Sequence, residues 1–195
     1  MPPFDGAQGD NGSLVRFYGT FIPLHGIETI IRAAKELPDV RFELLGKGQT
    51  REDMEALAAS LEVKNVRFLD PVPLAALPAF IHGADICLGI FGTSDKAQRV
   101  IPTKAYEVLA CAKPLITARS PAYGRVLTDR EHVFFVEAGN AHALAQGIRE
   151  LLENPSLAQH IAERGHALFE ERFQSKMITK TLMEWMKTYP NPTNM

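Results

Sequence analysis

The sequence predicts an α/β fold in which a doubly wound, parallel sheet of six strands carries helices on both faces. Short apolar runs alternate with longer amphipathic segments along most of the chain, and strands that alternate with helices form parallel sheets. Hydrophobic residues make up 46% of the 195 residues and charged residues 23%. That balance is typical of a globular domain with one substantial core.

Six apolar runs are expected to be strands, because they are short and end at polar or glycine-containing segments. They cover residues 14–19, 41–46, 65–70, 85–91, 114–118 and 132–136. Amphipathic segments between them are expected to be helices, at residues 26–37, 51–61, 74–84 and 102–111. Pro78 should disturb the third of these helices, since proline removes a backbone donor.

The last third of the chain is predicted to be mainly helical. Residues 141–154 carry an apolar stripe. Asn154 is the expected N-cap of the following helix, with Pro155 in its first turn. A final helix is expected from about residue 175 to 189. We therefore expect a flexible leader at 1–13, a Rossmann-like domain at 14–174, and a C-terminal helix and tail at 175–195.

Composition and charge argue against several classes of protein. The formal net charge is −2 and the basic residues are scattered, which disfavours nucleic acid as a partner. No apolar stretch approaches the ~18 residues of a membrane span, and residues 1–13 lack the apolar centre of a signal peptide. Cys87 and Cys111 are expected to be free thiols, a disulfide being the alternative. No spacing of Cys or His residues is typical of a metal site.

The topology predicts where a ligand would bind. In doubly wound sheets the ligand lies beyond the carboxyl ends of the strands, where the strand order reverses. With the order 3-2-1-4-5-6, the loops at residues 19–26 and 92–104 face each other at that point. The second loop leads into helix 102–111, and Pro102 suits its first turn. A helix N-terminus presents free N–H groups and a partial positive charge, which attract phosphate.

Two charged residues within this otherwise apolar helix indicate a nucleotide. Thr103, Lys104 and Glu107 can share one helix face. Lys104 could reach a phosphate, and Glu107 could accept hydrogen bonds from ribose hydroxyls, as an acidic residue does in dinucleotide folds. Together they would hold a nucleoside diphosphate. The alternative is a surface Lys104–Glu107 ion pair, worth a few tenths of a kcal/mol.

Four longer stretches of the sequence resemble the sequence patterns of a known family. In chain order they are "YGTFIPLHGIETIIRAAKEL" (18–37), "ELLGKGQTREDMEAL" (43–57), "EVLACAKPLITARSPAYGRVL" (107–127) and "HVFFVEAGNAHALAQGIRELLENPSL" (132–157). In this order they resemble the C-terminal, donor-binding half of GT-B glycosyltransferases, most closely retaining family 4. Its patterns are G-R-x-x-x-x-K-G, G-x-G, E-A-M-A-x-G-x-P-V-I and G-D-x-x-x-L-A. The resemblance covers roughly residues 14 to 175.

The resemblance implies which residues contact the donor. They are Gly19, Thr20, His25 and Gly26 in the first loop, and Lys96, Arg99, Thr103, Lys104 and Glu107 in and after the second. Glu107 matches the second Glu of the family, but Arg99 replaces its first acidic residue. Thr20 and His25 replace a phosphate-binding Arg and Lys, so Lys96, Arg99 and Lys104 are expected to restore the charge. His25 could also serve as a base, although a phosphate contact or a loop hydrogen bond is preferred. No catalytic residue is assigned.

The resemblance further implies sugar transfer from a nucleoside-diphosphate donor to an acceptor in polysaccharide biosynthesis, with no metal or other cofactor. The acceptor would be held mostly by an N-terminal domain that is missing here, so the isolated domain is expected to be inactive. The full-length enzyme would be cytoplasmic, and it could contact the inner face of the membrane as a peripheral protein. The alternatives are half of a nucleotide-sugar epimerase of the same architecture, or a non-catalytic nucleotide-binding module.

Overall fold

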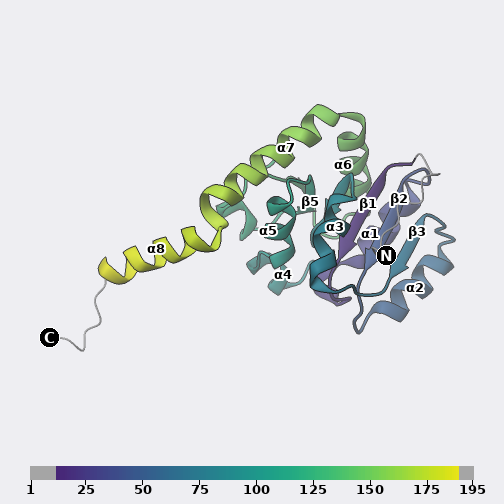
Figure 1. The fold of residues 1–195 in the computed structure, drawn as a ribbon. Coiled ribbons are helices and arrows are strands. Elements are labelled where there is room, and N and C mark those ends of the chain that lie inside the picture. The colour runs from purple at the N-terminus through teal and green to yellow at the C-terminus, as the bar shows by residue number, and fades with distance from the viewer. Residues whose placement is uncertain (1–11, 189–195) are drawn as a thin grey trace.

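The computed structural model describes residues 12–188, and it contains the predicted six-stranded parallel sheet (Figure 1). The strands run in the order β3-β2-β1-β4-β5-β6, as predicted. Their bounds are β1 Leu14–Tyr18, β2 Arg41–Leu45, β3 Val66–Leu69, β4 Ile86–Leu88, β5 Leu115–Ala118 and β6 Phe134–Val136. The leader expected at 1–13 and the tail expected to end at 195 lie largely outside the described residues.

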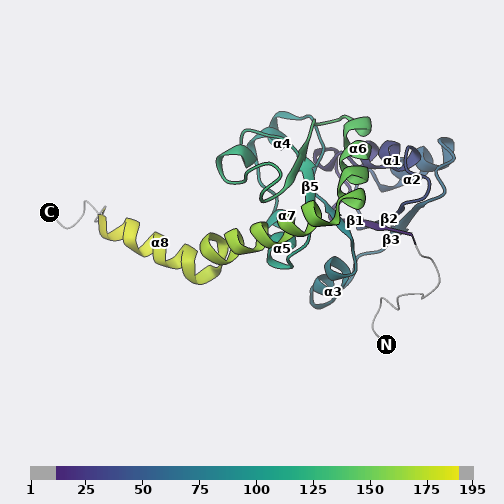
Figure 2. The same ribbon diagram turned by 90° about the horizontal axis from the view of Figure 1, so that it is seen from above.

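Helices cover both faces of this sheet (Figure 2). On one side lie α1 (Ile27–Lys35), α2 (Arg51–Ser60) and α6 (Ala141–Glu153). On the other lie α3 (Leu77–His82) and α5 (Thr103–Ala110). Neighbouring residues of a strand point to opposite faces of the sheet. Phe17 of β1 therefore packs into the core on the side of α1, α2 and α6, and Tyr18 packs into the core on the side of α3 and α5.

Three local features differ from the sequence-based expectation. β4 ends at Leu88, not at residue 91, and beyond this end the Thr117 hydroxyl accepts the Ile90 N–H at 3.2 Å. Residues 92–104 are not all loop, since α4 occupies Asp95–Arg99 with Ser94 as its N-cap. Pro102 is the N-cap of α5 rather than a helical residue, because its ψ of 148° is extended.

The C-terminal helices begin where the sequence predicts. The Asn154 side chain accepts the Leu157 N–H at 3.1 Å, and α7 (Pro155–Leu168) begins with Pro155. A π-helical turn at Phe169–Phe173 links α7 to α8 (Ser175–Thr188).

The helix α8 projects away from the rest of the molecule (Figures 1 and 2), and none of its described residues is buried. The final helix expected from about residue 175 is therefore present, and it is largely exposed. Cys87 and Cys111 are both free. Within residues 12–188, no helix has the length and apolarity needed to cross a membrane.

Candidate nucleotide-sugar site

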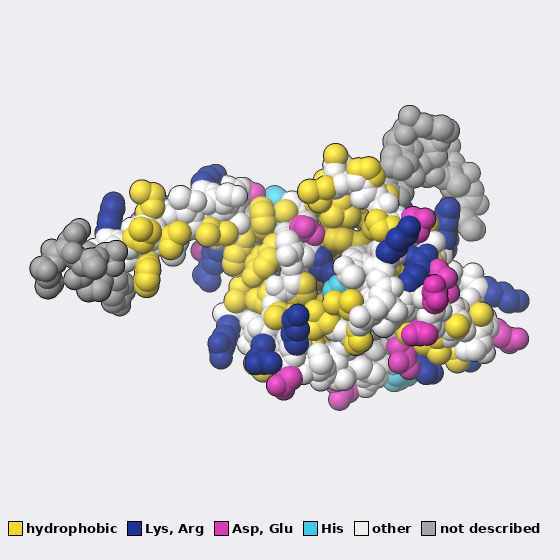
Figure 3. Space-filling model, turned by 90° about the horizontal axis from the view of Figure 1, so that it is seen from below, with side chains coloured by type: hydrophobic (Ala, Val, Ile, Leu, Met, Phe, Trp, Pro, Cys, Tyr) yellow, Lys and Arg dark blue, Asp and Glu magenta, His cyan; other side chains and the backbone are white. Residues whose placement is uncertain are grey.

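The loops after β1 and β4 meet at the carboxyl ends of the strands. The first contains a 3₁₀ turn at Pro23–His25, closed by Gly26 in the left-handed conformation (φ 62°). The carbonyl of His25 accepts the Phe91 N–H at 3.0 Å, and α4 contacts the same turn. This end of the sheet points to the lower edge of Figure 1, and Figure 3 views the molecule from that side. The structure therefore brings the two predicted loops together.

Two glycines allow the loop after β1 to lie directly on the loop after β2. Gly19 and Gly46 have φ values of +144° and +147°. A Cβ atom on Gly46 would lie 1.9 Å from the Gly19 carbonyl oxygen, so the two backbones touch. The Phe21 N–H donates to the Lys47 carbonyl at 2.9 Å across the same contact. The "GKG" segment (46–48) thus lies against the loop after β1, and a turn follows it at residues 49–50.

Lys104 is buried, with 6% of its surface exposed. Its Nζ lies 3.8 Å from the centre of the Phe17 ring and has no hydrogen-bond partner among the described residues. Burial holds the pKa of the Lys104 ammonium well below its usual range, and the negative charge of Glu107 opposes this only in part. The alternative of a surface Lys104–Glu107 ion pair is therefore wrong.

Glu107 is half-buried, and its partner is an aromatic hydroxyl. The Tyr18 hydroxyl donates to Glu107 Oε2 at 2.9 Å and lies 3.2 Å from the Lys104 carbonyl oxygen. Burial and the nearby Glu107 charge raise the pKa of Tyr18, so its hydroxyl stays protonated and remains a donor. Sequence reasoning missed Tyr18. The available signal was a tyrosine at the end of a buried strand, because a buried Tyr hydroxyl usually finds a partner.

His25 is buried and electrically neutral. Its Nδ1 bonds to the Thr20 carbonyl oxygen. Because a carbonyl only accepts, Nδ1 carries the hydrogen and Nε2 is left as an acceptor. Burial, and next the charge of Lys104, lower the pKa of His25 to about 4, although the bond to Thr20 opposes the shift. At neutral pH His25 therefore orders the loop after β1 and supplies no positive charge.

The remaining predicted residues lie at the surface of the site. Thr20 and Thr103 are exposed, and the first turn of α5 contains no acidic residue that would repel an anion. Lys96 and Arg99 are exposed on α4. The Arg99 guanidinium donates to the Asp95 carbonyl at 3.2 Å and lies 3.7 Å from the Asp95 carboxylate, so it is held within its own helix.

A hollow of about 310 Å³ continues from this cluster toward β2 and β3. Gly19, Thr20 and Gly46 form its polar backbone edge, and its wall is mostly apolar. The wall includes Leu45, Pro71, Val72, Leu74 and Leu77. Leu74 is 78% exposed, an unusual position for a large apolar side chain. The hollow thus places an apolar wall next to the first predicted loop.

Comparison with known proteins identifies the family. The family model described as "Glycosyl transferases group 1" matches residues 4–168. The chain belongs to this family. A lipopolysaccharide core biosynthesis glycosyltransferase of Rhizobium meliloti is 28% identical over 183 residues, which are 91% of this chain and 50% of the relative. The chain spans about half the length of the curated relatives that it matches.

Solved structures of other proteins share the fold. The crystal structure of Anabaena HepE in complex with UDP and glucose matches 91% of this chain and 48% of its own, with a TM-score of 0.80 and 20% identity. The C-terminal domain of a group 1 glycosyltransferase from Francisella tularensis matches with a TM-score of 0.71 and 17% identity, covering 84% of this chain and 87% of its own. The fold is therefore that of the C-terminal half of a GT-B glycosyltransferase, as predicted.

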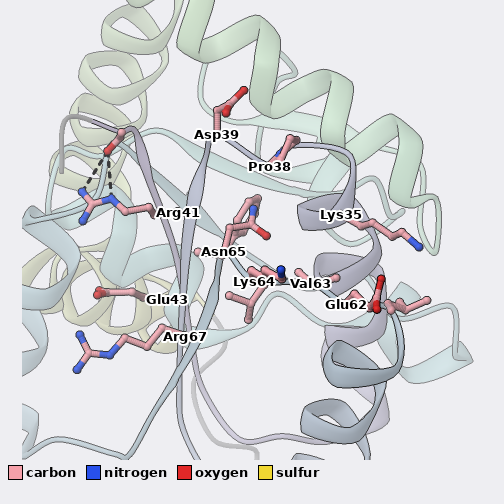
Figure 4. Close-up of a pocket in the computed structure, with 14 residues that line it drawn as sticks. Lys35, Pro38, Asp39, Arg41, Glu43, Glu62, Val63, Lys64, Asn65 and Arg67 are labelled. Carbon is pink, nitrogen blue, oxygen red and sulfur yellow. Dashed lines mark hydrogen bonds between the residues drawn. The ribbon is translucent and has the colours of Figure 1, made fainter.

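A larger hollow, of about 870 Å³, lies at the opposite end of the sheet (Figure 4). It is lined by residues at the amino ends of β2 and β3, and its charges are mixed. They comprise Lys35, Arg41, Lys64 and Arg67 against Asp39, Glu43 and Glu62. Arg41 donates to the Gly12 carbonyl at 3.1 Å, and the Asn65 amide donates to three backbone carbonyls. These side chains support the turns around them, and the group 1 site is expected at the other end.

No cluster within residues 12–188 holds three or more His, Cys, Asp or Glu residues placed to bind a metal ion.

Proposed function

We propose that this chain is the donor-binding domain of a glycosyltransferase, and that it binds a nucleoside-diphosphate sugar for transfer to an acceptor. One structural observation supports the proposal in addition to family membership. The buried side-chain nitrogen of Lys104 has no hydrogen-bond partner among residues 12–188, and Lys104 lies in the first turn of α5 where the strand order reverses. A helix N-terminus and a cation together suit a diphosphate.

The neighbouring residues suit the other parts of such a donor. Glu107 offers carboxylate oxygens to the ribose hydroxyls, one turn further along α5. The exposed Thr103 and Thr20 hydroxyls and the backbone at Gly19 and Gly26 would contact the phosphates. Lys96 and Arg99 would add positive charge from α4. The apolar wall beside Gly19 would support the base. During transfer, the helix dipole and Lys104 would stabilise the departing diphosphate, an electrostatic role that needs no metal.

A second domain would complete the enzyme. The curated relatives are about twice as long as the matched chain, which supports an acceptor-binding half elsewhere in the protein. The names of relatives from Rhizobium meliloti and Mycobacterium leprae, a lipopolysaccharide core glycosyltransferase and a phosphatidyl-myo-inositol mannosyltransferase, support a cell-surface polysaccharide or glycolipid as the product. We place the enzyme in the cytoplasm, with peripheral contact at the inner face of the membrane.

A ligand panel followed by titration tests the proposal. Thermal shifts with UDP-, GDP-, ADP- and dTDP-sugars identify the preferred donor, and calorimetry then compares wild type with Glu107→Ala. We expect binding to weaken by about 1–3 kcal/mol, the scale for losing hydrogen bonds to a charged group.

The control is Glu52→Ala, which removes an exposed carboxylate from α2 and should leave the affinity unchanged. Failure of every donor to bind would reject the proposal. Equal affinity of Glu107→Ala and wild type would reject the role of Glu107.

A further inference from the structure

The ammonium of Lys104 is unusual because burial of a charge is costly unless the charge is paired. Its Nζ is fully enclosed and has no hydrogen-bond partner among residues 12–188. Its closest aromatic contact is the Phe17 ring at 3.8 Å, with the Tyr18 ring at 5.9 Å. Such cation–π contacts replace only part of the lost hydration. The protein neighbours of Lys104 therefore do not offset the free-energy cost of burying its charged form.

The titratable groups around Lys104 are already engaged with other partners. Glu107, on the same helix, accepts its hydrogen bond from Tyr18 of β1. His25, in the loop after β1, donates from Nδ1 to the Thr20 carbonyl. Neither side chain forms an ion pair or hydrogen bond with Lys104 Nζ in the described part of the chain.

A single glycine links the ammonium to the hollow at the carboxyl ends of the strands. Gly19 lines that hollow. A Cβ atom on Gly19 would lie 2.9 Å from Lys104 Nζ and 3.1 Å from His25 Cε1. The absence of a side chain at this position therefore leaves the ammonium next to the backbone that borders the site.

We propose that the Lys104 side chain binds the diphosphate of the donor, and that it takes up one proton from solvent when a nucleoside-diphosphate sugar binds. This inference rests on the proposed function and adds a proton-linked mode of binding. Where burial keeps Lys104 as a neutral amine in the free protein, its Nζ gains an N–H bond on binding, the buffer loses a proton, and the resulting ammonium meets the anion.

The direction of the pH dependence follows from burial. In the free protein burial lowers the pKa of Lys104, whereas a bound anion favours the charged form and raises it. Binding therefore takes up a proton between the lowered and the raised pKa. Affinity is greatest where Lys104 is already charged, and it falls by up to tenfold per pH unit as the pH rises through that window. His25 is already neutral there, since its pKa is about 4.

Calorimetric titration in buffers of different ionisation enthalpy counts the protons. The ligand is the nucleotide sugar that gives the largest thermal shift with wild type in the panel above, because both phosphates of such a donor are already ionised near neutral pH. We expect wild type to take up a proton and His25→Gln to retain the uptake. Lys104→Met should lose the uptake and bind at least tenfold more weakly. The matched control is Lys64→Met, which removes an exposed ammonium at the other end of the sheet.

A second measurement does not depend on how well the variant folds. Titration of the Lys104 side chain by NMR in the wild-type chain should give a pKa below that of the other lysines, and added donor should raise it. Donor binding without proton uptake, or uptake retained in Lys104→Met, would overturn this inference and leave the proposed function standing. If no donor of the panel binds, both fail together.

Discussion

At the scale of single residues, the helix α5 holds two ionisable side chains that do not form an ion pair with each other. The carboxylate of Glu107 accepts a hydrogen bond from Tyr18, and the Nζ atom of Lys104 faces the ring of Phe17. The sequence identified both charges, since they stand out in an apolar helix. Their partners come from β1, 89 residues away in the case of Tyr18. A contact at that separation depends on strand order and side-chain direction, which local patterns do not encode.

Tyr18 should act as a positioning residue for Glu107. The Tyr18→Phe variant keeps the ring and removes the donor to the carboxylate, so Glu107 is free to change rotamer. We expect donor binding to weaken by about 0.5–1.5 kcal/mol, the net value of one hydrogen bond. Calorimetry measures the change, and it should be smaller in a Glu107→Ala background, where the carboxylate is already absent.

The matched control is Tyr123→Phe. This tyrosine is also buried, but the partner of its hydroxyl is the Thr117 hydroxyl, at 3.4 Å. Its removal should lower thermal stability without changing donor affinity. Equal loss of affinity in both variants would mean that Tyr18 acts only through general packing.

At the scale of elements, the sequence predicted the strands and the long helices well, and it missed one short helix. The strand positions followed from short apolar runs, and the start of α7 followed from the Asn154 cap. The helix α4 was missed, because five residues are too few to show a period of 3.6. The signal that could have found it was Ser94 followed by Asp95, a residue pair typical of a helix start.

The projecting helix α8 should contribute little to the stability of the domain. Five of its large apolar side chains are 53–59% exposed, namely Ile178, Leu182, Met183, Trp185 and Met186. Figure 3 shows hydrophobic side chains along its length. Deletion of residues 175–195 should leave the melting temperature within about 2 °C of wild type, and should reduce self-association because an exposed apolar face is lost. Calorimetry and light scattering measure the two effects.

A slightly longer deletion provides the contrast. Removal of residues 173–195 also takes away Phe173, whose ring packs 4.8 Å from the ring of Tyr106 on α5. That variant should melt at a clearly lower temperature. Equal and large losses in both deletions would show that α8 packs against its own domain.

At the scale of the whole molecule, the doubly wound topology indicated where the candidate site lies, but it did not describe the interior of that site. The order of the strands reverses between β1 and β4, as expected for this topology, and this brings the two loops together. The state of the side chains inside the candidate site depends on how deeply each one is buried. Lys104, expected to reach a phosphate, lies enclosed beneath the loop after β1, and His25 is neutral. The degree of burial depends on how the whole chain packs, so residue spacing alone could not predict it.

The isolated chain should bind a nucleotide sugar without transferring the sugar. Under the proposed function, binding requires only the candidate donor cluster at the carboxyl ends of β1 and β4, and these residues all lie within this chain. Transfer requires both reactants to be held together in one cleft, where positioning supplies much of the rate, and the curated relatives are about twice as long as this chain. We therefore expect calorimetric binding of the preferred donor, with no sugar transferred to added acceptors and no release of nucleoside diphosphate above the buffer rate. A full-length group 1 glycosyltransferase, assayed with its own donor and acceptor, is the positive control. Repeated turnover of the donor by this chain would contradict the division of labour between two domains, because the acceptor would then have to bind within residues 1–195.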